Sequence, residues 1–70
     1  MTNKLAIWTI YDHPLDYSSG FIARKFELDQ PTSETVTGTT LQGVREQLPL
    51  GLTRIARDNM DHPSVVESWL

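Results

Sequence analysis

The stretch Leu5-Ala-Ile-Trp-Thr-Ile-Tyr11, followed by Asp12-His13-Pro14, decides the fold. β-Branched and aromatic residues dominate the stretch, and the Asp-His-Pro that follows is typical of a turn, so it predicts a first strand. Its residues are apolar on both faces of that strand. One short helix cannot cover both faces of a sheet, so the second face needs sheet curvature, a loop or another chain as its cover.

Four further segments have the composition of strands: Phe21–Leu28, Glu34–Thr37, Leu52–Ala56 and Val65–Leu70. In the second strand, Ile22 and Phe26 share one face with Arg24, whose stem can pack there while its charged end reaches water. In the last strand, alternation places Val65 and Glu67 on one face.

A single helix is predicted between the third and fourth strands. Thr39 is the expected N-cap, with Gln42 as its capping-box partner, and Pro49 and Gly51 end the helix. Its apolar stripe consists of Leu41, Val44 and Leu48. The sequence therefore predicts an α+β protein with a single domain over residues 1–70. Its mainly antiparallel sheet carries one short helix, in the order β-β-β-α-β-β.

Length, charge and cysteine content restrict the function. The 70 residues include no cysteine, which excludes disulfides, thiolate zinc sites and cysteine nucleophiles. The net charge of −3 argues against broad binding to nucleic-acid phosphates. The chain start is a poor signal peptide, and no apolar run is long enough to span a membrane. We therefore expect a cytoplasmic protein with no membrane association.

Asp12-His13-Pro14 and Asp61-His62-Pro63 repeat one tripeptide and contain both histidines. Turn formation explains such a sequence, because Asp accepts backbone hydrogen bonds and Pro fixes φ. If successive elements are antiparallel, both segments lie at the same end of the sheet. The resulting candidate rim for a ligand or a partner consists of Asp12, His13, Asp16, Asp61 and His62.

A divalent cation such as zinc, or a small polar ligand, is one occupant that this rim could hold. Neither histidine has a His-x-His or His-x-x-x-His spacing, so we expect no metal and no cofactor. Ser18 and Ser19 lie close to His13 in sequence, but no Gly-x-Ser-x-Gly turn exposes a nucleophile. We therefore expect no enzymatic activity.

Two further sets of residues are candidates for binding. The basic set would serve a nucleic-acid-associated regulator, and it consists of Arg24, Lys25, Arg54 and Arg57. The second set would form a protein interface, and it consists of Trp8, Trp69 and Leu70. The two tryptophans lie on strands that would be antiparallel neighbours, so a cross-strand pair in the core is the alternative for them.

Several motifs together resemble a group of small, uncharacterised bacterial and phage-associated proteins. The motifs are Trp8-x-Ile10-Tyr11-x-x-Pro14-x-Asp16-Tyr17, Ala23-Arg24, Leu41-x-x-Val44-Arg45-x-x-Leu48-Pro49-x-Gly51-Leu52 and Val65-Val66-Glu67-Ser68-Trp69-Leu70. The resemblance implies one compact domain and no catalytic signature. The leading hypothesis is a small interaction or accessory protein that acts through a binding surface, with an unknown protein or a second copy (a homodimer) as its partner.

Overall fold

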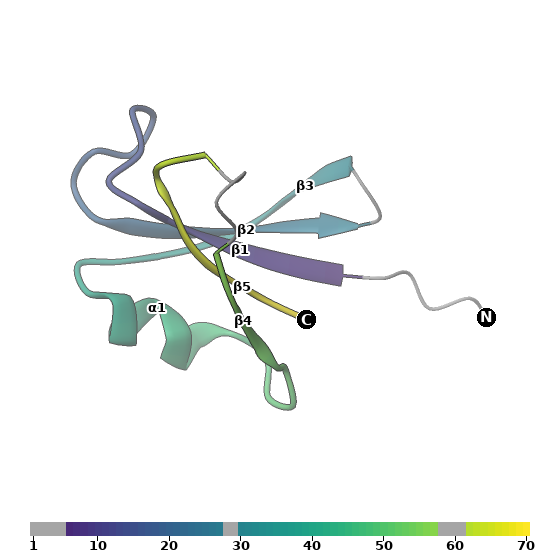
Figure 1. Cartoon of the computed structure of the whole chain (residues 1–70). Coiled ribbons are helices and arrows are strands. Elements are labelled where there is room, and N and C mark those ends of the chain that lie inside the picture. Colours follow the sequence, from purple (N-terminus) through teal and green to yellow (C-terminus); the bar gives the residue numbers. More distant parts are fainter. Residues whose placement is uncertain (1–5, 28–29, 58–61) are drawn as a thin grey trace.

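The computed structural model describes residues 6–27, 30–57 and 62–70 of the chain. Within these residues it contains five strands and one helix, in the predicted order β-β-β-α-β-β (Figure 1). The elements are β1 (Ala6–Asp12), β2 (Phe21–Glu27), β3 (Gln30–Gly38), α1 (Leu41–Gln47), β4 (Arg54–Ala56) and β5 (Val65–Trp69). The predicted α+β class is confirmed.

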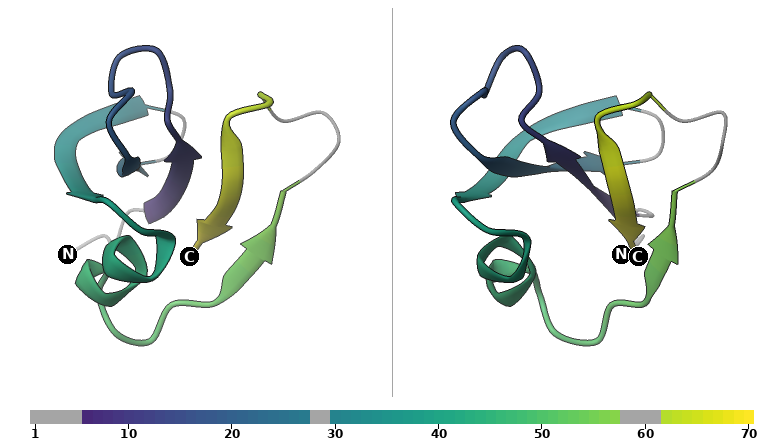
Figure 2. Two further views of the ribbon diagram at one scale, coloured as in Figure 1. Left: turned by 90° about the vertical axis from the view of Figure 1, so that its left-hand side faces the viewer. Right: turned by 60° about the vertical axis from the view of Figure 1, so that its left-hand side comes forward.

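The strands form one sheet in the order β3-β2-β1-β5-β4, and every neighbouring pair is antiparallel. The central position of β1 fits a strand that is apolar on both faces. Figure 2 shows that the sheet is strongly curved and that α1 runs along its open side. Curvature and the helix therefore cover one face of β1 together.

The main core lies between α1 and the sheet. From the helix, Val44 and Leu48 are buried and Leu41 packs against them, as the apolar stripe predicts. Gln42 and Glu46 are exposed. The sheet contributes the buried residues Trp8, Ile10 and Ala23. Along the described stretches, no helix has the length and apolar character needed to cross a membrane.

Two strands differ most in length from the prediction. β3 begins at Gln30 rather than at Glu34, and it contains Pro31. An edge strand tolerates proline because one of its sides needs no hydrogen-bonded neighbour. β4 is shorter than the predicted 52–56, because Leu52 turns in against the core before the strand begins.

The N-cap of the helix is Thr40, so the expected cap at Thr39 is wrong. Thr40 has an extended backbone, and its Oγ1 accepts a 3.0 Å hydrogen bond from the Gly43 N–H. A capping-box partner is the third residue of the helix, and with Thr40 as the N-cap this residue is Gly43. Gln42 therefore does not act as a capping-box partner. The helix ends at Gln47, and the backbone of its C-cap, Leu48, is extended as expected before a proline.

A second, smaller apolar group lies on the sheet face away from α1. A bulge in the β1–β5 pairing lets Val65 pair with Tyr11 while Glu67 pairs with Ile10. Paired residues share a face, so Val65 and Glu67 lie on opposite faces and their predicted common face is wrong. Val65 is buried on this second face next to Tyr11, and Ile22 is buried on the other side of Tyr11.

Candidate functional site: a cleft between two loops

The first Asp-His-Pro segment and the described residues of the second, His62 and Pro63, meet at one end of the sheet, as predicted. β1 ends at Asp12, and its antiparallel neighbour β5 begins shortly after His62. The Asp12 N–H donates a 2.8 Å hydrogen bond to the Ser64 carbonyl, which joins the two loops directly. Asp61, the fifth predicted rim residue, lies outside the described residues.

Asp12 and His13 form hydrogen bonds within the first loop, between β1 and β2. His13 has a positive φ of 46°, and its N–H donates a 2.8 Å hydrogen bond to the Gly20 carbonyl. Its Nδ1 is bonded to the Asp12 carboxylate, and its ring packs edge-on against Phe21 with centroids 5.4 Å apart. A Cβ at Gly20 would lie 2.5 Å from the Gly38 carbonyl oxygen, so glycine permits the close approach between the end of this loop and β3.

A cleft of about 320 Å³ lies between the two loops, on the sheet face away from α1. We call it the loop cleft, and its lining residues are Tyr11, Pro14, Leu15, Asp16, Arg24, His62 and Ser64. Its volume falls in the range of small-ligand sites. Of the predicted rim residues, the structure brings Asp16 and His62 into this lining.

Arg24 supplies the positive charge of the loop cleft. It lies on β2, with its guanidinium carbon 6.0 Å from the centre of the Tyr11 ring, and it forms an ion pair with Asp16. The Arg24 side chain is 32% exposed, whereas that of Asp16 is 64% exposed. An ion pair this open to water contributes only ~0–1 kcal/mol to stability. The sequence placed Arg24 on an apolar face, and the contact with Tyr11 explains how it packs there.

His62 is fixed at the edge of the loop cleft by the turn that starts β5. Its Nδ1 accepts a 3.1 Å hydrogen bond from the Ser64 N–H, and its carbonyl accepts one of 2.9 Å from Val65. Because Nδ1 acts as an acceptor, Nε2 is the ring atom that can donate to a bound group. Across the cleft, the Leu15 side chain is fully exposed. The cleft therefore combines apolar surface with one cation, one carboxylate and one imidazole.

The structure assembles no metal centre from the residues that it describes. In these residues, no group of three or more histidine, aspartate or glutamate side chains is placed to hold an ion. The two histidines use their Nδ1 atoms within their own loops, where His13 bonds Asp12 and His62 accepts from Ser64.

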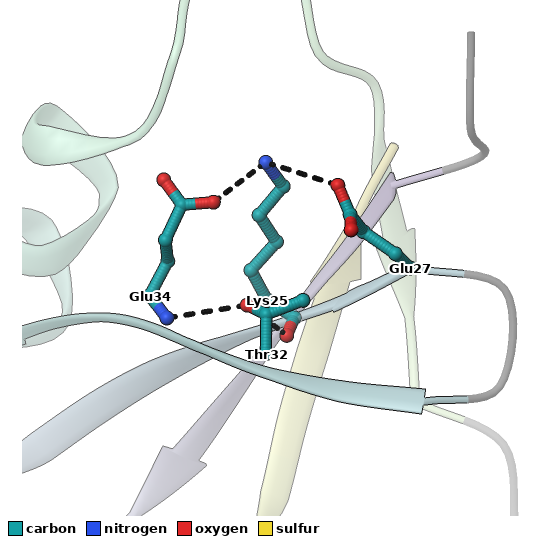
Figure 3. Close-up of polar contacts among 4 residues, drawn as sticks. All are labelled: Lys25, Glu27, Thr32 and Glu34. Atoms are coloured by element: carbon teal, nitrogen blue, oxygen red, sulfur yellow. Dashed lines mark hydrogen bonds and ion pairs between the residues drawn. The ribbon is translucent and has the colours of Figure 1, made fainter. Parts of the chain in front are cut away.

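The predicted basic residues do not share one surface. Arg24 lies on the cleft face, whereas Lys25, the next residue of β2, points to the opposite face. Figure 3 shows Lys25 between two carboxylates: its Nζ lies 2.8 Å from Glu34 Oε2 and 3.8 Å from Glu27 Oε2. The hydrogen bond to Glu34 raises the pKa of Lys25. Thr32 completes this group by donating to the Lys25 carbonyl at 2.9 Å.

Glu67 forms ion pairs with Arg45 and Arg54 on the sheet face that α1 covers, and the sequence did not predict this role. Its side chain is 2% exposed, and its two carboxylate oxygens accept hydrogen bonds from Arg45 Nε at 2.7 Å and Nη2 at 2.6 Å. The indole Nε1 of Trp69 donates a third bond of 2.7 Å, and Arg54 lies 3.7 Å away. The bonds from Arg45 hold the pKa of Glu67 below its ordinary value, with further lowering from Trp69 and Arg54.

Trp8 and Trp69 form a directly opposed pair across β1 and β5, which confirms the predicted cross-strand alternative. Trp8 is 6% exposed and belongs to the main core, and Trp69 packs against that core. This burial leaves Trp8 little surface for the interface considered from the sequence. Leu70 is 40% exposed, and it exchanges two backbone hydrogen bonds with Thr53 beside β4.

Comparison of the chain with models of protein families, with curated proteins and with solved structures found no match. The resemblance noted from the sequence motifs therefore stays a prediction.

Proposed function

We propose that the protein is a small interaction module that binds a segment of a partner protein in the loop cleft. The observation that carries this proposal is the fully exposed Leu15 at the mouth of a cleft built by two joined loops. An exposed leucine whose side chain a partner covers contributes about 1.5–3 kcal/mol to association. The cleft adjoining it offers the aromatic and arginine side chains that are enriched where binding energy concentrates.

The chemistry of the two loops favours binding over catalysis. In a Ser-His-Asp triad the histidine Nδ1 donates to the carboxylate and Nε2 takes the serine proton. The His62 Nδ1 accepts from the Ser64 N–H, so its Nε2 carries the ring proton and cannot act as that base. His13 has Asp12 on its Nδ1, but among the described residues no hydrogen bond joins it to Ser18 or Ser19, which are exposed loop residues. These contacts support a binding role for the loops.

Site-specific photo-crosslinking tests the proposal. A photoreactive residue would replace Leu15 in one variant and Leu50 in a matched control, since both leucines are fully exposed. In a lysate of the source cells, we expect discrete adducts at position 15 that excess wild-type protein competes away, and none of them at position 50. Identical adducts at both positions, or none at position 15, would refute the proposal. An adduct of twice the chain mass identifies a second copy as the partner.

A further inference from the structure

We infer that the loop cleft binds an acidic segment of its partner, whose carboxylate replaces Asp16 on Arg24 while an adjoining aliphatic side chain lies against Tyr11 and Leu15. This inference rests on the proposed function and specifies the chemistry of the partner. It follows from the difference between the two members of the ion pair.

Arg24 is held in place by the sheet. It lies near the middle of β2, paired with Thr9 of the central strand on one side and with Thr35 of β3 on the other. About two-thirds of its side chain is buried, and the guanidinium lies over the Tyr11 ring. A guanidinium presents five N–H donors in a planar fork that matches a carboxylate. The cleft therefore contains a preorganised carboxylate-binding group.

Asp16 is held far less firmly. It lies in the loop between β1 and β2, where a 2.9 Å hydrogen bond from the Tyr17 N–H to the Pro14 carbonyl forms a turn. Its side chain is mostly in water, so its ion pair contributes little and a competing carboxylate displaces it at small cost. Asp16 thus occupies in the free protein the position that the partner's acidic group takes in the complex.

The other charges near the cleft agree with an anionic ligand. His62 offers its Nε2 as a second donor, and the Asp12 carboxylate is already bonded to His13. A cationic ligand would instead have to share Asp16 with Arg24 and would place two like charges in contact. The net charge of −3 has a small effect at physiological salt, where charges beyond about 8 Å are screened.

Titrations with small peptides followed by amide NMR spectra test the inference. The probes are N-acetyl-leucyl-glutamate amide and its glutamine and lysine counterparts. We expect the glutamate probe to bind about tenfold more tightly than either counterpart, because it alone carries a carboxylate that can form a bidentate ion pair with the guanidinium. Signals of the two loops should shift, while those of α1 should not.

Three variants locate the effect. Asp16→Asn should tighten binding of the glutamate probe, because it weakens the internal competitor, and Arg24→Gln should abolish the preference for glutamate over glutamine. Glu46→Gln is the matched control: it changes the net charge as Asp16→Asn does, but from the exposed side of α1, so affinity should not change. If Arg24→Gln fails to fold, the affinities of Asp16→Asn and Glu46→Gln for the glutamate probe are compared without it, and tighter binding by Asp16→Asn alone supports the inference.

The outcomes separate this inference from the proposed function. Equal affinity for the glutamate and glutamine probes, no tightening in Asp16→Asn, or no saturable binding of the glutamate probe to Asp16→Asn at millimolar concentrations would each overturn the acidic ligand. Crosslinking at Leu15 would still stand in those cases, and the interaction module with it. Loss of that crosslinking refutes the module itself.

Discussion

Glu67→Gln is the substitution that should destabilise the protein most specifically. Glu67 is almost fully buried, and its carboxylate accepts two hydrogen bonds from Arg45 and one from Trp69. A glutamine side chain has one acceptor oxygen, and its amide group would face an N–H donor in the same space. The variant therefore loses one or two charge-assisted bonds without changing the volume of the side chain.

The expected loss in unfolding free energy is about 3 kcal/mol. Hydrogen bonds to charged groups contribute ~1.5–3 kcal/mol each, and breaking a buried ion pair costs about 3–5 kcal/mol. The lower end applies, since Arg45 is 31% exposed and its guanidinium can turn to water. A domain of this size has roughly 5 kcal/mol of stability in total, so the variant should be only marginally folded.

Urea unfolding followed by tryptophan fluorescence and far-ultraviolet circular dichroism measures this loss. With a slope of ~1 kcal/mol per molar urea, the midpoint should fall by about 3 M. The control is Glu46→Gln, a chemically identical change on the exposed side of α1, which should leave the midpoint within error. A double variant, Arg45→Met with Glu67→Leu, should recover most of the stability because no buried charge remains unpaired. A Glu67→Gln midpoint within about 0.5 M of the wild type would refute the reasoning.

Three further predictions use the same assay. The pKa of Glu67 lies below its ordinary 4.5, so its contribution is complete above that pH and decreases as the pH falls toward the lower folded value; the wild-type midpoint should decrease more steeply there than that of Glu67→Gln, and parallel curves would contradict this. Leu48→Ala should cost ~2–5 kcal/mol and leave little cooperative unfolding, whereas Leu50→Ala, at a fully exposed position, should change stability by less than ~0.5 kcal/mol. Thr40→Ala should cost about 1 kcal/mol and Thr39→Ala much less, and the reverse order would restore Thr39 as the cap.

The fold was predictable where several neighbouring residues carry the same local signal. A run of β-branched and aromatic residues that ends at Asp-His-Pro specified β1, and the spacing of Leu41, Val44 and Leu48 specified the buried side of α1. Single-residue choices were not predictable in the same way. Thr39 and Thr40 are chemically identical caps, and only the backbone conformation of the chain leaving β3 selects Thr40.

The position of the site in the fold was predictable, but only some of the residues that line it were. Counting antiparallel reversals predicted that the two Asp-His-Pro segments lie at one end of the sheet, because that count requires only that each element runs antiparallel to the one before it. Arg24 and Tyr11 join the cleft through pairing between β1 and β2, and the sequence does not specify that register. The contact between Arg45 and Glu67 joins α1 to β5 across a large sequence separation, so no local spacing could indicate it.

The bulge in β5 allows one strand to contribute to both the Arg45–Glu67 ion pair and the loop cleft. Without the extra residue, strict alternation would place Val65 and Glu67 on the same face, so that either the carboxylate left Arg45 or the valine left Tyr11. With it, one strand supports the helix through Glu67 and backs the cleft wall through Val65. β5 also pairs with the edge strand β4. Loosening of β5 would therefore disturb the contact with the helix and the wall of the loop cleft together. We therefore expect that breaking the ion pair between Arg45 and Glu67 also loosens the loop cleft, although the two lie on opposite faces of the sheet.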